Sequence, residues 1–407
     1  MALNIKKFSA TLKQSLMAYA FNIFGIVAGT IVAYNAGLFE KVPWAIAIYP
    51  PILSARGVIG GLFCGRLSTA LHLGMIKPRL FGNTKSFHLL FQAIVVMTFE
   101  TSFVMSFAAA LFRSFYASIT VDELLNIVCM VVATMALALI VISPLTLLVS
   151  FFSFKHGFDP DIILYPIEST VADLLITAIY ISTLNFFIVY SYFSRYFLAS
   201  VSLISVLTAI YFFVRNRREA EFVKTLKESL LTIIFVSFII NVAGATLGKV
   251  DETLRERREL YGSYPIYVVY PALIDTIGDV GAVVGSTATT KLALGTLKSS
   301  FYSMKSHLTE ISGAWIASLI MYMVYSFLAL IIKGFLNPLN LLKFTVLLIT
   351  ANIIAASFII LISYAVAILT YQKGLDPDNF EIPIESSFAD SVTTISLLAA
   401  MLFIAVI

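Results

Sequence analysis

The chain has 407 residues, of which 27 are basic and 23 acidic, so that 12% of the residues are charged and 59% are hydrophobic. Soluble domains carry about 25% charged residues, and this chain lacks the charge needed to solvate such surfaces. The composition therefore excludes a disordered protein, a nucleic-acid-binding protein and an ordinary cytosolic enzyme. It predicts an all-α polytopic membrane protein embedded in a lipid bilayer.

The apolar runs predict about eleven membrane-spanning helices, because one helix needs about 20 mostly apolar residues to cross the hydrocarbon core. The polar, basic start shows no signal-peptide cleavage pattern, so the first run is expected to be a span. The fifth and sixth spans are expected to divide at Ser194 and Arg195. In chain order the expected spans are 15–35, 43–65, 87–112, 124–152, 166–192, 197–214, 229–247, 264–290, 311–333, 341–370 and 383–407.

Basic residues in the short loops predict the orientation, because Lys and Arg are enriched on the cytoplasmic side. Basic clusters precede the first span and follow the second and the sixth, which places all three clusters on one side. The segment from Lys249 to Glu259 is expected as an outside loop and, being rich in Arg, is the one exception. We expect a multi-pass protein of the cell membrane with its N-terminus in the cytoplasm and its C-terminus outside.

The sequence contains an internal duplication. GFDPDIILYPIESTVAD, from Gly157, matches GLDPDNFEIPIESSFAD, from Gly374, and Val-Ala-Gly ending at Gly29 recurs at Gly244. We assign residues 1–193 to a first repeat, 194–224 to a linker with one span, and 225–407 to a second repeat. Because each repeat holds five spans and the linker adds one, the repeats are expected to be parallel. A pseudo-dimeric monomer with a central path between its repeats follows from this arrangement.

Two equivalent aspartates, Asp173 and Asp390, lie about two turns into the fifth span of each repeat. Ionisable side chains inside the bilayer are costly and mark ion pathways by default. Hydroxyl residues lie four positions before and after each aspartate: Ser169 and Thr177, and Ser386 and Thr394. Each set is expected to form a polar stripe on one helix face. The alternative, aspartates that cap neighbouring helix ends, does not require matched hydroxyl stripes.

Other residues of these spans have two interpretations each. Glu168 and Glu385 lie two residues after a proline and are expected in the first helical turn, as helix-start acids or at the entrance to a pore. The second spans carry glycines that expose carbonyl groups to a pore or permit close helix packing. These glycines are Gly57, Gly60, Gly278 and Gly281.

The two repeats also differ at several charged positions. Asp275 and Asp279 occur only in the second repeat, where Val58 stands opposite Asp279. Arg56 of the first repeat aligns with Ile277. Glu100, in the third span, has no acidic counterpart, and is expected either to contact an ion or to pair with Arg56 or Arg66.

These motifs resemble the integral-membrane domain of the MgtE family of magnesium transporters and channels, most nearly its duplicated single-chain relatives in the eukaryotic solute-carrier branch. That branch has a P-x-x-L-G-L-K-G-N pattern followed by R-L-S-T, which is similar to Pro50, Arg56, Gly57 and Arg66-Leu67-Ser68-Thr69 here. Gly278-Asp279 stands at the family's G-G-N pattern. Its D-P-D-x-x-x-x-P-I segment occurs twice, each time leading to a fifth-span aspartate. The chain departs from the pattern at Val58, where the family has Asn.

The resemblance implies permeation of divalent cations, with Mg²⁺ as the transported ion, no organic cofactor, and the fifth-span aspartates coordinating Mg²⁺ through water. Mg²⁺ keeps several waters and is usually held by one or two carboxylates. The candidate ligands are Asp173, Asp390, Ser169, Ser386, Asp279 and Asp275.

Two other functions remain open from the sequence. Two close carboxylates in a low dielectric tend to bind a proton, so a proton- or sodium-coupled exchanger is the first alternative. An intramembrane enzyme is a remote one, because no HExxH, paired His or Ser–Lys arrangement lies at membrane depth.

Overall fold

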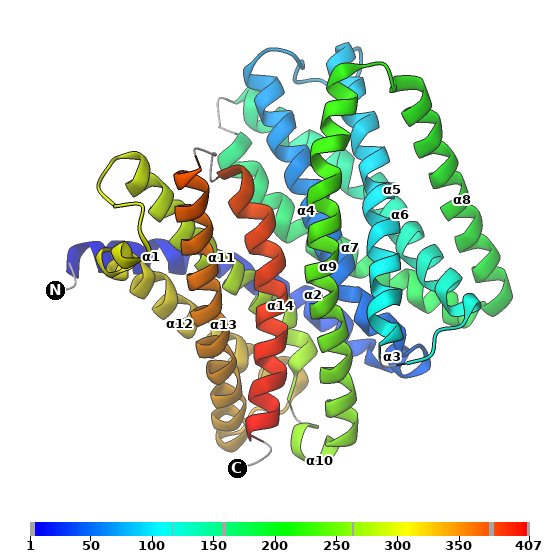
Figure 1. The fold of residues 1–407 in the computed structure, drawn as a ribbon. Coiled ribbons are helices and arrows are strands. Elements are labelled where there is room, and N and C mark those ends of the chain that lie inside the picture. Colours follow the sequence, from blue (N-terminus) through cyan, green and yellow to red (C-terminus); the bar gives the residue numbers. More distant parts are fainter. Residues whose placement is uncertain (1–4, 116, 157–159, 263, 374–377, 405–407) are drawn as a thin grey trace. The chain divides into compact units, whose positions relative to one another are not determined.

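The computed structural model describes residues 5–115, 117–156, 160–262, 264–373 and 378–404, which form helices and no strand (Figure 1). The helices are α1 (Ile5–Tyr19), η1 (Ala20–Asn22), α2 (Ile23–Tyr34), α3 (Ala36–Lys41), α4 (Trp44–His72), α5 (Lys85–Ser114), α6 (Val121–Lys155), α7 (Pro160–Val189), α8 (Ser191–Asn216), α9 (Ala220–Glu256), α10 (Arg258–Tyr261), α11 (Ile266–Ala293), η2 (Phe301–Ser306), α12 (Leu308–Lys333), α13 (Pro338–Gln372) and α14 (Asp378–Ile404).

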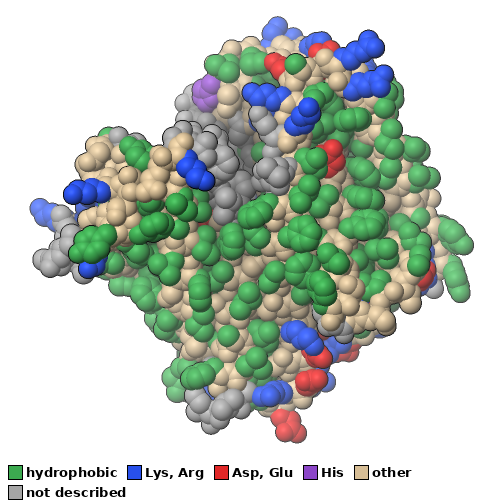
Figure 2. All heavy atoms as spheres, in the orientation of Figure 1, with side chains coloured by type: hydrophobic (Ala, Val, Ile, Leu, Met, Phe, Trp, Pro, Cys, Tyr) green, Lys and Arg blue, Asp and Glu red, His purple; other side chains and the backbone are tan. Residues whose placement is uncertain are grey.

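Eleven helices of the described part are long and apolar enough to cross a membrane, with α1, η1 and α2 counted as one. The expected all-α polytopic fold is thereby confirmed. Figure 2 shows hydrophobic side chains spread along the helices, with Lys and Arg gathered where helices end. The sixth span, in α8, is the least buried, with 17% of its window inside the protein. Such an exposed apolar surface fits contact with lipid.

Two expected boundaries are wrong. The fifth and sixth spans divide at Tyr190, between α7 and α8, and Ser194 and Arg195 lie inside α8. The expected outside loop from Lys249 is helical as far as Glu256, because α9 continues through it. Within this segment Asp251 pairs with Arg255 four residues later, so its opposite charges compensate each other on one helix face.

The chain forms two compact units. The first, here called the C-unit, comprises Met1–Tyr34 and Thr246–Ile407, and the second, the N-unit, comprises Asn35–Ala245. Each unit therefore includes the first long helix of the other repeat. The helices α1 and α2, from the first repeat, belong to the C-unit, and most of α9, from the second repeat, belongs to the N-unit. The boundaries of the sequence repeats themselves remain a prediction.

The same close helix crossing occurs once in each unit. In the C-unit, a Cβ at Gly29 of α2 would lie 2.2 Å from the carbonyl oxygen of Val268 in α11. In the N-unit, a Cβ at Gly244 of α9 would lie 2.1 Å from the carbonyl oxygen of Ala47 in α4. Backbones can approach this closely only at glycine, so the duplicated Val-Ala-Gly motif has a packing role in both units.

His307, between η2 and α12, is fully buried in the C-unit. Its ring Nε2 lies 3.1 Å from the carbonyl oxygen of Val284, and its Nδ1 lies 3.1 Å from the ammonium nitrogen of Lys291. Burial first, and then the positive charge of Lys291, lower the pKa of His307 from 6.5 to about 4. The folded protein therefore holds a neutral imidazole.

This burial predicts acid sensitivity. In the unfolded chain His307 binds a proton below about pH 6.5, whereas the folded chain resists protonation until about pH 4. Stability is therefore fully present above pH 6.5 and falls as the pH drops, by about 3 kcal/mol at pH 4. Thermal unfolding of His307→Gln between pH 7 and 4 should show a shallower loss than the parent protein. His156→Gln, at an exposed position, is the control, and an unchanged slope in His307→Gln would contradict the assignment.

Candidate functional site

In the N-unit, the fifth-span aspartate forms a buried ion pair. Asp173 of α7 is 9% exposed and Arg56 of α4 is 6% exposed. The Nη2 group of Arg56 donates a hydrogen bond to Oδ1 of Asp173. The guanidinium therefore supplies the positive charge that this buried carboxylate requires.

In the C-unit, the second-span helix carries an apolar residue at the position equivalent to Arg56. Asp390 of α14 is 8% exposed, and Ile277 of α11, at the position equivalent to Arg56, is fully buried. The two fifth-span carboxylates are thus buried alike, but the arginine of the first repeat has no counterpart in the second.

The hydroxyls one turn beyond the aspartates join the second- and fifth-span helices. Thr177 lies 3.0 Å from the hydroxyl of Tyr49 in the N-unit, and Thr394 lies 2.9 Å from the hydroxyl of Tyr270 in the C-unit. The two tyrosines are equivalent in the repeats, and comparing the two halves would have found them. Both pairs are buried and hold α7 on α4 and α14 on α11.

The buried polar stripe on α14 includes Asp390 and Thr394, as expected, but not Ser386. Ser386 is exposed, whereas Ser387 is buried, as are Asp390 and Thr394. Because a helix turns 100° per residue, a shift of one position moves the buried face away from Ser386. The side chains of Ser169 and Glu168, in the first repeat, lie outside the described residues.

Glu385 is not in the first turn, because α14 begins at Asp378 and Pro383 lies inside the helix. Its carboxylate is 4% exposed and accepts a hydrogen bond from the hydroxyl of Ser363, at 2.7 Å. The helix backbone at Gly281 makes room for it, since a Cβ there would lie 1.9 Å from Oε1 of Glu385. α7 likewise begins at Pro160, well before Glu168. Glu385 is an interior acid of the C-unit.

This contact predicts a dependence between two positions. In Gly281→Ala, the added methyl group should displace the Glu385 carboxylate and break its bond to Ser363, lowering stability by about 1–2 kcal/mol. In a Glu385→Ala background the same change should cost clearly less, because only the hydroxyl of Ser363, 2.7 Å from the added Cβ, must then move. Gly278→Ala is the control, because a Cβ there meets Ala389 at an ordinary 3.8 Å. Equal destabilisation with and without Glu385, measured by thermal unfolding, would rule out this explanation.

Asp279 is bound to the N-terminal part of the C-unit. The amide of Asn22 donates to Oδ2 of Asp279 at 2.7 Å and to the hydroxyl of Thr276 at 3.2 Å. Thr276 also bonds to the hydroxyl of Tyr325, at 2.8 Å. Asp279 and Asp275 are both half-buried on α11. No sequence signal pointed to Asn22, because its partners lie in the other repeat.

Glu100 lies half-buried on α5, and its Oε2 is buried without a hydrogen-bond partner in the described part of the chain. The expected pairing with an arginine is not formed there: Arg56 contacts Asp173, and Arg66 donates to the hydroxyl of Thr225 at 2.9 Å. Its proposed role in ion contact therefore stays open.

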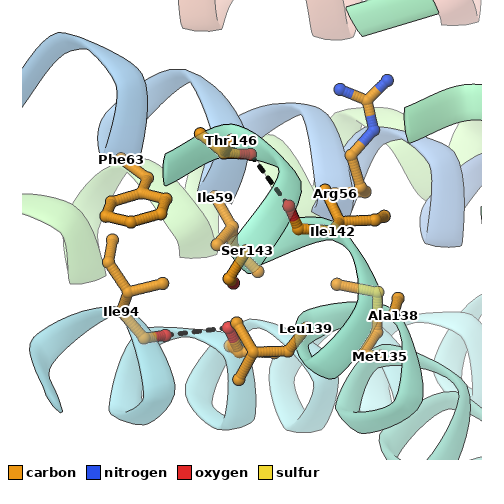
Figure 3. Close-up of a pocket in the computed structure, with 12 residues that line it drawn as sticks. Arg56, Ile59, Phe63, Ile94, Met135, Ala138, Leu139, Ile142, Ser143 and Thr146 are labelled. Atoms are coloured by element: carbon orange, nitrogen blue, oxygen red, sulfur yellow. Dashed lines mark hydrogen bonds between the residues drawn. The ribbon is translucent and has the colours of Figure 1, made fainter. Parts of the chain in front are cut away.

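The N-unit contains a cavity of about 30 Å³ beside Arg56, lined mainly by apolar side chains and by Gly60 (Figure 3). The guanidinium of Arg56 extends away from the apolar lining residues. Thr98 and Thr146 donate to carbonyl oxygens of their own helices, at 2.8 and 3.1 Å. The described residues that line this space include no carboxylate, and the hydroxyls of Thr98 and Thr146 already donate within their own helices. Gly57, one turn earlier on α4, has open space where a Cβ would lie.

Among the described residues, no three His, Cys, Asp or Glu side chains are placed to hold a metal ion together. A dehydrated ion in an all-protein cage is therefore not supported by these side chains. A hydrated ion needs only one or two carboxylates, and Asp390, Asp279 and Glu385 each provide one within the C-unit.

Comparison with known proteins agrees with the repeat structure. The MgtE family, described as a divalent cation transporter, matches residues 49–183 and 270–400, together more than half of the chain. The two matches begin at Tyr49 and Tyr270, which are equivalent in the repeats.

Two curated relatives align over most of the chain. Solute carrier family 41 member 3 of Mus musculus is 22% identical over 389 residues, covering 90% of this chain and 76% of the relative. The protein of the same name from Rattus norvegicus is 22% identical over 397 residues, covering 92% and 82%. No solved structure matches the chain.

Proposed function

Because the chain belongs to the MgtE family of divalent cation transporters, we propose that it carries Mg²⁺ across the membrane and that Asp173 and Asp390 bind the hydrated ion. The protein is a multi-pass membrane transporter and not an enzyme. The observation that supports the site most directly is the burial of both aspartates inside membrane-spanning helices, at equivalent positions of the two repeats.

The chemistry of the aspartates suits this role. A buried carboxylate in a spanning helix is costly and requires a positive partner. A divalent ion stabilises such a carboxylate, and Mg²⁺ can keep its waters while doing so. That both aspartates act on the same ion rests on their equivalence in the sequence repeats. A single chain with a cytoplasmic N-terminus and an outside C-terminus completes the proposal.

The membrane potential is sufficient as a driving force. A divalent ion that crosses the whole field at 100 mV releases about 2 × 2.3 kcal/mol, so inward transport requires no coupling ion. The purified chain in proteoliposomes, loaded with a fluorescent Mg²⁺ indicator, should take up Mg²⁺ when the inside is made negative. Uptake should not require a proton or sodium gradient.

The same flux assay tests the alternative function, a proton- or sodium-coupled exchanger. Mg²⁺ movement that follows an imposed proton or sodium gradient, and ignores the potential, would identify a coupled exchanger. The absence of divalent flux in either condition, against protein-free vesicles, would contradict the proposed transport itself. Asp122→Asn, at a position exposed on α6, serves as the matched variant with normal flux.

A further inference from the structure

The second-span helices place different residues at the position equivalent to Arg56 in the two repeats. In the N-unit, α4 brings Arg56 into direct contact with Asp173, and the two charges neutralise each other. In the C-unit, α11 places Ile277 at the position of Arg56 and adds Asp275 and Asp279, which the first repeat lacks.

The asymmetry extends along the helices that carry these residues. α14 contains no Lys or Arg, and α11 contains only Lys291, in its last turn. Lys291 is paired with Glu310, at 2.8 Å, at the end of the helix. α14 and α11 thus carry Asp390, Glu385, Asp279 and Asp275 with no arginine among them.

A guanidinium and a divalent cation compete for the same carboxylate. Arg presents a fixed, permanently charged group that binds a carboxylate well in a buried setting. While the pair is closed, Oδ1 of Asp173 already accepts a hydrogen bond from Arg56. An ion that binds Asp173 must first displace the guanidinium of Arg56. Ile277, at the equivalent position of the second repeat, carries no charge that an ion would have to displace.

We propose, building on the function proposed above, that Arg56 is a tethered counter-cation, which occupies the divalent-ion position at Asp173 until the ion displaces it. Binding of the ion at Asp173 therefore requires that the guanidinium of Arg56 first leaves this carboxylate. The guanidinium weakens ion binding at rest, and its return to Asp173 favours release.

Mn²⁺ binding provides the test, because the electron paramagnetic resonance signal of free Mn²⁺ reports the bound fraction directly. The purified full chain in nanodiscs is titrated with Mn²⁺ alone. Arg56→Gln should tighten Mn²⁺ binding by about tenfold or more, the size expected when a close competing charge is removed. The gain should disappear in Arg56→Gln/Asp173→Asn, because it acts through Asp173.

Two further variants keep the test independent of folding defects. Ile277→Arg places the same cation on the C-unit helix and should weaken Mn²⁺ binding by a similar factor. Arg66→Gln, on the same helix as Arg56 but bonded to Thr225, should leave the affinity unchanged. Thermal unfolding with EDTA and with Mn²⁺ shows that each variant is folded, and Arg56→Gln should gain more stability from Mn²⁺ than the parent does.

The outcomes separate this inference from the proposed function. If Asp390→Asn weakens Mn²⁺ binding but Arg56→Gln leaves the affinity unchanged or lowers it, Arg56 is a structural partner of Asp173 and the inference is wrong. A gain in Arg56→Gln that persists without Asp173 would also overturn it. If Asp390→Asn binds Mn²⁺ as the parent does, the proposed ion site itself fails.

Discussion

Asp390→Asn is expected to reduce Mg²⁺ flux in proteoliposomes by roughly two orders of magnitude, which corresponds to about 3 kcal/mol of lost ion stabilisation. The amide keeps the size of the carboxylate and removes its charge, so a hydrated divalent ion loses its strongest partner in the C-unit. The side chain is buried, and a neutral amide is less costly there than a carboxylate. The variant should therefore remain folded.

Asp173→Asn should also lose flux, but it leaves Arg56 without its carboxylate partner. Thermal unfolding must accompany this measurement, because the loss of one partner of a buried ion pair is itself destabilising. The double variant should be little worse than the worse single one, since both residues are proposed to act on one ion. Glu168→Gln should have a much smaller effect.

Near-normal flux in Asp390→Asn would place the ion site elsewhere. Asp275 and Asp279 are then the next candidates, because they are the carboxylates of α11, which packs against the helix of Asp390. The Mg²⁺ flux of Asp279→Asn would then show whether Asp279 binds the ion. Thermal unfolding of the same variant would show how much the altered bond to Asn22 destabilises the protein.

Gly29→Ala and Gly244→Ala are expected to destabilise the protein by about 3 kcal/mol or more each, at the upper end for overpacking. In both, the new Cβ would meet a backbone carbonyl oxygen, of Val268 at 2.2 Å and of Ala47 at 2.1 Å. A carbonyl within a helix cannot rotate away as a side chain can, so the helices must separate. Thermal unfolding in nanodiscs, together with the yield of folded protein, measures the effect.

Gly57→Ala is the matched control, because it adds the same methyl group to a spanning helix at a position with no atom within 4 Å. Its stability should equal or slightly exceed that of the parent, since alanine favours the helix. A small and equal effect at positions 29, 57 and 244 would show that the close crossings do not limit stability.

Much of the architecture could be predicted from local sequence properties. The eleven apolar runs predicted the spans, because the thickness of the hydrocarbon core fixes how long each run must be. The duplication is also visible in the local geometry: Gly74 and Gly295, at equivalent positions, both have φ of 68° just after the ends of α4 and α11. Each of these signals depends only on residues close together in the chain.

Local signals failed where a helix boundary depends on its surroundings. The prolines before Glu168 and Glu385 favoured helix starts, yet α7 and α14 begin several residues earlier and include them. The polar segment after Lys249 was expected as a loop because of its charge, but neighbouring residues pair along the helix and α9 continues. Composition indicates where charge lies and not whether it is compensated.

The sequence by itself determined that this is a membrane protein, that it is duplicated, and that two equivalent acids lie within its fifth spans. Only the tertiary structure decided what surrounds those acids: that Arg56 reaches Asp173, that Ser363 and Gly281 hold Glu385, and that Asn22 binds Asp279. It also decided that each compact unit includes the first long helix of the other repeat. The physical reason is range: spans follow from apolar runs of about 20 residues, whereas these contacts join positions up to 257 residues apart in the chain.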